Sequence, residues 1–291
     1  MTATVKTSTV RDYWMLLKPS VMSLVIFTAF CGFLLAPGKM HPIEAFIGLL
    51  AIAVGAGGAG VLNMWYERET DAKMSRTRKR PIANQTIAPG NALAFGLILS
   101  GVSIFLLSFS ANYYAAILLA FTIFFYGIVY TVWLKPRTPQ NIVIGGIAGA
   151  FPPIIGWILV SHDFSWIPTL MFFIIFLWTP VHFWALALYR VDDYTKAKIP
   201  MLPAVVGRKK TCEQMFLYAL LTVLTTLIPF FMEFFSIFYF LIALLLGGYL
   251  VHLTWVVWKK DMRKAGRLFG YSIIYLFVLF LAMVVDRWLF S

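Results

Sequence analysis

The chain has 291 residues, of which 61% are hydrophobic and 12% are charged, and its mean hydropathy is +0.83. Soluble domains carry roughly 25% charged residues, so this composition excludes a soluble globular protein and indicates a polytopic membrane protein. Basic residues outnumber acidic ones by 24 to 12, which gives a formal net charge of +12. The two isolated cysteines, Cys31 and Cys212, form neither a disulfide framework nor a metal-binding spacing, so we expect packing roles for both.

The apolar segments, taken in chain order, predict nine membrane-spanning helices, because one span needs about 20 apolar residues. These segments lie at residues 20–36, 43–65, 93–109, 114–133, 141–160, 167–188, 212–232, 237–257 and 268–287. A short polar tail, residues 1–13, precedes them, and the first apolar run is too long for a signal peptide. We therefore predict an all-α bundle of nine transmembrane helices that forms a single domain over residues 1–291.

The basic residues predict the orientation of this bundle. All of them except Lys39 and Arg287 lie in the N-terminal tail or in alternate connections. The positive-inside rule then places the N-terminus in the cytoplasm and the C-terminus outside. Two cytoplasmic connections, residues 66–91 and 189–211, are long, and long loops in compact proteins are usually functional. We expect a multi-pass protein of the bacterial inner membrane whose active site faces the cytoplasm.

The first long loop follows three polar residues at intervals of four, Asn63, Glu67 and Asp71. If the second predicted helix continues through them, their side chains share one face. Oxygen ligands of this kind suit Mg²⁺, which proteins hold with one or two carboxylates and substrate phosphates. Basic side chains that would complement a phosphate follow directly: Arg68, Lys73, Arg76, Arg78, Lys79 and Arg80.

The second long loop also combines acids and bases, with Asp192, Asp193, Lys196 and Lys198. Two clusters at one depth could face each other across the bundle, with a diphosphate between them and Mg²⁺ stabilising the leaving charge. Acids at a membrane edge are costly and usually functional. The alternative is that these residues are solvated helix ends.

The spacing of Asn63, Glu67 and Asp71 resembles the Asn-xxx-Asp-xxx-Asp motif of the UbiA-type intramembrane prenyltransferases, whose fold is a nine-helix bundle. Residues 63–77, 135–153, 178–190 and 192–203 resemble one branch of them, the protohaem IX farnesyltransferases or haem O synthases. The resemblance implies that farnesyl diphosphate donates a farnesyl group to a vinyl group of haem B, and that water completes a hydroxyethylfarnesyl side chain. It also implies a partner in terminal-oxidase assembly, such as haem A synthase, and no nucleic acid.

Two departures from the wider family affect the site residues that the resemblance implies. Glu67 stands where that family has aspartate, and Lys196 replaces the second aspartate of the Asp-xxx-Asp motif that starts at Asp192. Lys196 is therefore expected to contact the diphosphate. The predicted catalytic residues are Asn63, Glu67, Asp71, Asp192 and Lys196; the metal ligands Glu67, Asp71 and Asp192; and the further diphosphate-binding residues Arg76, Lys135, Arg137 and Lys198.

Haem iron directs attention to the four histidines. His41 and His162 fall in short outer loops, whereas His252 and His182 lie within predicted helices. A lone histidine in a helix is usually hydrogen-bonded within the bundle, but His182 lies in a tryptophan-rich motif. We take His182 and Trp178 as candidates for haem contact, by ligation or by a hydrogen bond to a propionate. No Cys-xx-Cys-His motif is present, so we expect no covalent haem attachment.

Two clusters of small residues, 55–60 and 145–149, allow either close helix packing or space for a ligand. Two other functions are also possible. A related enzyme would prenylate an aromatic quinone precursor such as 4-hydroxybenzoate, and Lys196 argues against it. A haem transporter or chaperone would place its polar groups near the middle of the bilayer, whereas they gather here at one membrane edge.

Overall fold

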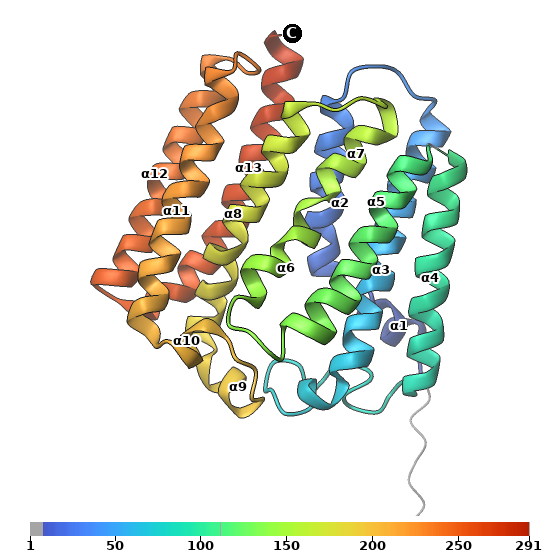
Figure 1. Ribbon diagram of the computed structural model, residues 1–291, viewed down its shortest axis with the longest axis vertical. Helices are drawn as coiled ribbons and strands as arrows, with labels where there is room; N and C mark the ends of the chain where they lie inside the picture. Colours follow the sequence, from blue (N-terminus) through green and yellow to red (C-terminus); the bar gives the residue numbers. More distant parts are fainter. Residues whose placement is uncertain (1–7, 111, 291) are drawn as a thin grey trace, which may run out of the picture.

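The computed structural model describes residues 8–110 and 112–290, and these residues form helices and connecting loops only (Figure 1). The helices are α1 (Val10–Leu16), α2 (Pro19–Leu35), α3 (Pro42–Asp71), α4 (Pro89–Ser110), α5 (Tyr113–Phe124), the π-helix η1 (Phe125–Leu134), α6 (Asn141–Ala150), α7 (Pro152–Val160), α8 (Trp166–Tyr189), α9 (Val191–Lys196), α10 (Leu202–Val205), α11 (Arg208–Phe231), α12 (Ile237–Lys259), the 3₁₀-helix η2 (Met262–Lys264) and α13 (Ala265–Phe290).

The helices account for the predicted spans. Within the described residues, eight helices are long and apolar enough to cross a membrane, and a ninth span results if α1 and α2, bent by 55° at their joint, count as one. The predicted segment 114–133 is α5 continued by η1, and the segment 141–160 is α6 followed by α7. The prediction of an all-α transmembrane bundle is confirmed.

Proline begins several of these helices. Pro19, Pro42, Pro89 and Pro152 start α2, α3, α4 and α7. Proline suits the first helical turn because its fixed φ matches the helix and its missing N–H would have no partner there. Pro152 also explains why the fifth predicted span is two helices, since proline cannot continue the hydrogen bonding of α6.

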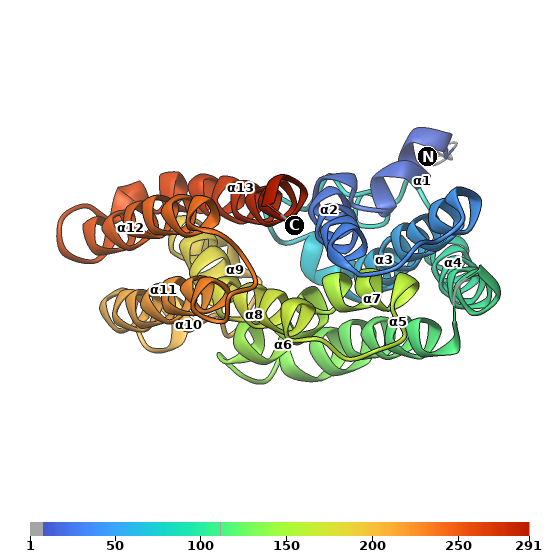
Figure 2. The same cartoon turned by 90° about the horizontal axis from the view of Figure 1, so that it is seen from above.

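The ends of the bundle differ. Figure 1 shows α1, α9, α10 and the loop after α3 at one end, and the C-terminal end of α13 at the other. Seen from above in Figure 2, α8, α11, α12 and α13 lie on one side and α2, α3, α4, α5 and α7 on the other. The helix α6 packs on α8 and links the two sides. The polar connections that follow α3 and α8 therefore meet at one end of the molecule.

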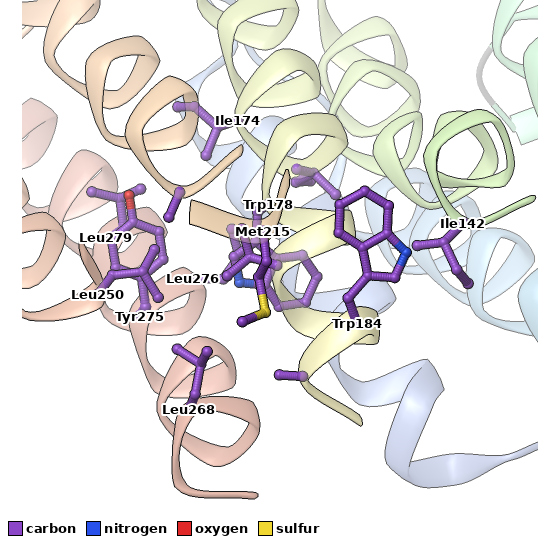
Figure 3. Packing of buried hydrophobic residues seen from close by; sticks show 14 of the residues in the cluster. Ile142, Ile174, Trp178, Trp184, Met215, Leu250, Leu268, Tyr275, Leu276 and Leu279 are labelled. Atoms are coloured by element: carbon purple, nitrogen blue, oxygen red, sulfur yellow. The ribbon is translucent and has the colours of Figure 1, made fainter. Parts of the chain in front are cut away.

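The largest apolar core lies between α8, α11, α12 and α13 (Figure 3). Trp178 and Met215 occupy its centre beside Leu276, and Trp184 extends toward Ile142 of α6. A second core joins α3, α5 and α7. A third core lies beside the polar end of α3 and includes Val61 and Met64. The buried faces hold α8 in a fixed position relative to α13, which matters for His182 below.

The small-residue clusters serve mainly for close packing. A Cβ atom on Gly58 would lie 2.7 Å from Ser100 Oγ of α4, and one on Gly145 would lie 2.2 Å from Tyr130 Cδ2 of η1. No atom lies within 4 Å of a Cβ built on Gly149. The glycines of α3 and α6 thus bring helices together at short distance, as small residues do in membrane proteins.

Candidate active site

The polar face of α3 is continuous. The helix runs to Asp71, so the prediction that it extends beyond its apolar segment is confirmed. Asn63, Glu67 and Asp71 are all buried, with side chains on one face of its last two turns. A row of one amide and two carboxylates therefore points into the protein at one end of the bundle.

Each of these three side chains pairs with a cation from a different part of the chain. Lys18, at the joint of α1 and α2, donates to Asn63 Oδ1. Lys135, directly after η1, forms an ion pair with Glu67.

The third pair joins Arg80 to Asp71, with 2.7 Å between Arg80 Nη1 and Asp71 Oδ2. Arg80 lies in the loop after α3, and Thr77 of the same loop donates to the backbone carbonyl of Asp71 at 2.9 Å. The loop is thereby fastened to the end of the helix whose carboxylate it neutralises.

The π-helix η1 supplies the opposite wall. Asn63 Nδ2 donates to Thr131 Oγ1 at 2.9 Å, and the Thr131 hydroxyl donates to the carbonyl of Tyr126, five residues earlier. Tyr126 and Tyr130 stack with ring centroids 5.4 Å apart, and Lys135 Nζ lies 5.9 Å from the Tyr130 centroid. π-Helical segments are uncommon and often occur at functional sites.

The ion pair sets the charge of Lys135. Burial by itself would lower the pKa of this lysine, but the adjacent Glu67 carboxylate more than offsets that effect and raises the pKa above its usual value. Lys135 therefore carries its positive charge beside Glu67 at neutral pH.

Asp71 also offers an atom for a metal ion. Its Oδ1 is buried and has no hydrogen-bond partner among the described residues, although Oδ2 is bound by Arg80. A buried carboxylate oxygen without a partner is costly, and a hard divalent cation would satisfy it. Together with the Glu67 carboxylate one turn away, the donor set fits Mg²⁺.

The charged side chains of the second acidic motif lie at the surface. Asp192 and Lys196 of α9, and Lys198 just after it, are exposed. Among residues 8–110 and 112–290, no three His, Cys, Asp or Glu side chains are grouped closely enough to hold a metal. The structure thus does not bring Asp192 to Glu67 and Asp71, and its role as a ligand stays a prediction, as do the roles of Lys196 and Lys198.

Asp193 joins the two long loops. Ser75 of the first loop donates its hydroxyl to Asp193 Oδ2 at 2.7 Å and its backbone N–H to Oδ1 at 3.2 Å. These bonds connect α9 to the loop that carries Arg80. Any movement of one loop is therefore coupled to the other.

This connection should depend on pH. The hydroxyl of Ser75 holds the pKa of Asp193 below its usual value, so the bonds are present above the ordinary aspartate pKa of about 3.9 and are lost as the pH falls through the lower folded value. At pH 7, Asp193→Asn should speed hydrogen–deuterium exchange in residues 72–88. The difference from the unsubstituted protein should shrink at acid pH, and an equal difference at every pH would contradict this account.

Two of the predicted diphosphate-binding residues are arginines with contacts of their own. Arg137 is exposed, and its Nη1 donates to the carbonyls of Val132 and Trp133 at 2.9 and 3.1 Å, at the end of η1. Arg76 lines a cavity of about 430 Å³ between α8 and α13. The other lining residues are Leu186, Tyr189, Arg190, Gly266 and Phe269. The cavity combines two guanidinium groups with aromatic rings.

His182 lies next to this cavity. Its ring stacks on Phe269 and on Trp178, with centroids 4.5 Å apart in each case, and its Nδ1 lies 2.7 Å from Ser272 Oγ. The Ser272 hydroxyl proton is used in a 2.7 Å bond to the carbonyl of Phe269. Nδ1 must therefore carry the proton in the neutral ring, and Nε2 keeps a lone pair.

Trp178 has a structural partner as well. Its indole Nε1 donates to the carbonyl of Ser272 at 2.8 Å, and the side chain is buried in the α8–α13 core. Trp178 thus fixes the ring of His182 from one face while Phe269 covers the other. Whether either contacts haem stays a prediction.

Lys18 is the residue of the site that the sequence did not indicate. We counted it only among the charges that set orientation, since it lies 45 residues before Asn63. The available signal was a lysine directly before Pro19, at the start of the first apolar run. Arg80 and Thr131 were likewise not assigned individual roles, because their partners lie on other elements.

A bundle of membrane-spanning helices with a cluster of acids and bases at one end is the arrangement expected of an intramembrane prenyltransferase. The chain belongs to the UbiA prenyltransferase family, whose family model matches residues 25–284. It is a prenyl-transferring enzyme and a multi-pass membrane protein.

The protoheme IX farnesyltransferase of Rhizobium johnstonii is 53% identical over 282 residues, which cover 95% of this chain and 89% of the relative. That of Brucella ovis is 50% identical over 289 residues, covering 98% and 93%. The resemblance to this branch is confirmed.

Solved structures support the fold. A structure of digeranylgeranylglyceryl phosphate synthase has a TM-score of 0.79 at 18% identity, and covers 95% of this chain and 97% of that one. A UbiA homologue from Archaeoglobus fulgidus bound to DMAPP and Mg²⁺ has a TM-score of 0.67 at 16% identity, with coverage of 93% and 99%. The helical arrangement is thus shared far beyond recognisable sequence similarity.

Proposed function

We propose that this enzyme transfers a farnesyl group from farnesyl diphosphate to a vinyl group of haem B, with Mg²⁺ bound at the diphosphate. Relatives with about half of their residues identical are named protoheme IX farnesyltransferases, and a structural relative binds DMAPP and Mg²⁺. The observation that carries the proposal is the buried row of Asn63, Glu67 and Asp71 with its surrounding cations. By the positive-inside rule, this site faces the cytoplasm of the bacterial inner membrane.

The proposed reaction breaks the allylic C–O bond of farnesyl diphosphate, and diphosphate leaves with the electron pair. The farnesyl carbon bonds to the terminal carbon of the haem vinyl group. A water molecule supplies a hydroxyl group to the other vinyl carbon and releases its remaining proton. The site must therefore stabilise a concentrated anion and tolerate a dispersed allylic cation.

The residues of α3 and its partners meet the first need. Glu67 and Asp71 would hold Mg²⁺, which neutralises charge on the departing diphosphate when bound. Lys135 lies within reach of the same anion, because it already contacts Glu67. Charge-assisted bonds to phosphate oxygens are among the strongest hydrogen bonds in proteins.

The stacked Tyr126 and Tyr130 meet the second need. Both rings belong to η1, and Lys135 lies over the second of them. The electron-rich face of an aromatic ring attracts a cation without forming a bond to it. We place the allylic end of the farnesyl chain beside this pair.

The cavity between α8 and α13 is the proposed position of the acceptor. Haem B carries two propionates, and Arg76 and Arg190 at this cavity could pair with them. Tyr189 and Phe269 offer aromatic surface for the porphyrin, and the Nε2 lone pair of His182 is suited to iron. This assigns Arg76 to the acceptor and not to the diphosphate.

Variants of the two arginines test that assignment. Arg76→Gln and Arg190→Gln should each raise the KM for haem B about tenfold, the loss of one charge-assisted hydrogen bond, and leave the KM for farnesyl diphosphate nearly unchanged. Arg78→Gln, an exposed change in the same loop, is the matched control and should alter neither constant. If Arg76→Gln raised only the KM for farnesyl diphosphate, Arg76 would be assigned to diphosphate binding, as the sequence predicted.

Acceptor choice tests the proposed function itself. Purified protein would be incubated with farnesyl diphosphate, Mg²⁺ and either haem B or 4-hydroxybenzoate, and the products separated by reversed-phase chromatography. We expect a more hydrophobic haem and one released diphosphate for each molecule of it, and no product from 4-hydroxybenzoate. Prenylated 4-hydroxybenzoate would support the quinone-precursor enzyme, and bound but unmodified haem would support a transporter or chaperone.

A further inference from the structure

The three oxygen-bearing side chains of the site share one property in this structure: each contacts a basic side chain of the protein. Lys18 binds Asn63, Lys135 binds Glu67 and Arg80 binds Asp71. The three cations come from the joint of α1 and α2, from the end of η1 and from the loop after α3. They converge on the positions where the proposed function requires a metal ion and a diphosphate.

Lys18 is the least expected of the three. Its backbone has φ 54° and ψ 59°, the left-handed conformation, which is unfavourable for a residue with a side chain. This conformation connects α1 and α2, which meet at 55°, and delivers the ammonium group to Asn63. Strain of this kind persists where the surrounding structure requires it, and it is often found at ligand sites.

The partner of Lys18 is also incomplete. Asn63 Oδ1 is a neutral amide oxygen, so it accepts a hydrogen bond but does not neutralise the charge. An ammonium group has three donors, and a partly buried cation is stabilised by an anion. Lys135 and Arg80 each form an ion pair with a carboxylate, whereas Lys18 forms none among the described residues. An anionic ligand would complete its contacts.

We propose that Lys18, Arg80 and Lys135 stand in for the metal ion in the substrate-free site, and that they turn to the diphosphate oxygens when the divalent ion binds Glu67 and Asp71. Lys18 is thus a diphosphate-binding residue, and it also competes with metal binding when no diphosphate is present. The proposal rests on the proposed prenyl-transfer site, but not on the identity of the acceptor.

Lys18→Met tests the exchange, because methionine keeps an unbranched apolar chain close to the length of the lysine stem and removes the ammonium group. Two affinities would be measured on the purified protein: Mn²⁺ binding without diphosphate, by electron paramagnetic resonance, and binding of unreactive farnesyl thiolodiphosphate with Mg²⁺ present. We expect Mn²⁺ to bind several-fold tighter and the analogue about tenfold weaker, the cost of one lost charge-assisted bond. Lys18→Arg should preserve both affinities.

The control is Lys210→Met, which removes an equal charge from an exposed position on α11 and should change neither affinity. If Lys18→Met lowers the affinity for both ligands, or changes neither affinity, the exchange is refuted. Lys135→Met provides the same two readouts should Lys18→Met not fold. If Mn²⁺ binds tighter and the analogue binds weaker, as expected, but the unsubstituted protein does not farnesylate haem, the proposed acceptor is refuted and the exchange is not.

Discussion

Asp71→Asn is expected to lower farnesyl transfer on the order of a thousandfold, the scale of losing a group that stabilises transition-state charge. Asparagine is nearly the same size and could still accept a bond from Arg80, which lies 2.7 Å from Asp71 Oδ2. It would lack the negative charge that holds a divalent ion, and it would bury an amide where Oδ1 now has no partner. Turnover of haem B by purified protein at saturating farnesyl diphosphate is the measurement.

The same variant tests whether the diphosphate and the acceptor bind at separate places. Haem absorbance on Asp71→Asn should match that of the unsubstituted protein, because the proposed acceptor cavity lies between α8 and α13. Asp163→Asn, an exposed change outside the cluster, is the control and should leave turnover unchanged. Loss of haem binding in Asp71→Asn, with the fold retained, would contradict the separation of acceptor and diphosphate.

Gly156→Ala should destabilise the bundle by about 3 kcal/mol or more, at the upper end of the cost of overpacking. A Cβ atom at Gly156 would lie 1.9 Å from the carbonyl oxygen of Ala29, a backbone atom that cannot turn away. In the opposite direction, a Cβ atom at Gly32 of α2 would lie 2.1 Å from the carbonyl oxygen of Pro153. Helices α2 and α7 would have to separate, and α2 begins directly after Lys18.

Thermal unfolding in detergent measures this effect. The matched control is Gly149→Ala on the adjacent α6, where no atom lies within 4 Å of the added Cβ. We expect a much lower midpoint for Gly156→Ala and little change for Gly149→Ala. Equal midpoints for the two variants would mean that α2 and α7 do not pack as closely as described.

Features with a local cause could be predicted from the sequence. The length of each apolar run predicted the spans, and the four-residue spacing of Asn63, Glu67 and Asp71 predicted a shared helix face. The break between α6 and α7 likewise follows from the pair Pro152 and Pro153, because proline cannot continue the hydrogen bonding of the preceding helix. Helical periodicity and proline geometry depend on residues within one segment, so they can be predicted from the sequence of that segment alone.

Features that depend on other segments could not be predicted in this way. The ion pairs of Glu67 and Asp71 are with residues 68 and 9 positions away, and the bond of Asn63 to Lys18 spans 45. Nothing in a single sequence indicates which of the many lysines and arginines in the loops contacts which acid.

Arg137 illustrates the converse. It lies close in sequence to Lys135, yet its guanidinium turns back to the carbonyls of its own helix end. Asp193 directly follows Asp192 in the sequence, but Ser75 of the other loop binds it. Loop conformation decided both, and loop conformation depends on contacts that the sequence does not display.

The chemical form of the product tests the account most directly. The purified enzyme would be given haem B, farnesyl diphosphate and Mg²⁺ in ¹⁸O-labelled water, and the haem analysed by mass spectrometry. We predict a haem that has gained one farnesyl group and one hydroxyl group, with the label in that hydroxyl, and no such product from Asp71→Asn. A haem of unchanged mass under conditions that preserve the fold would contradict the proposed function.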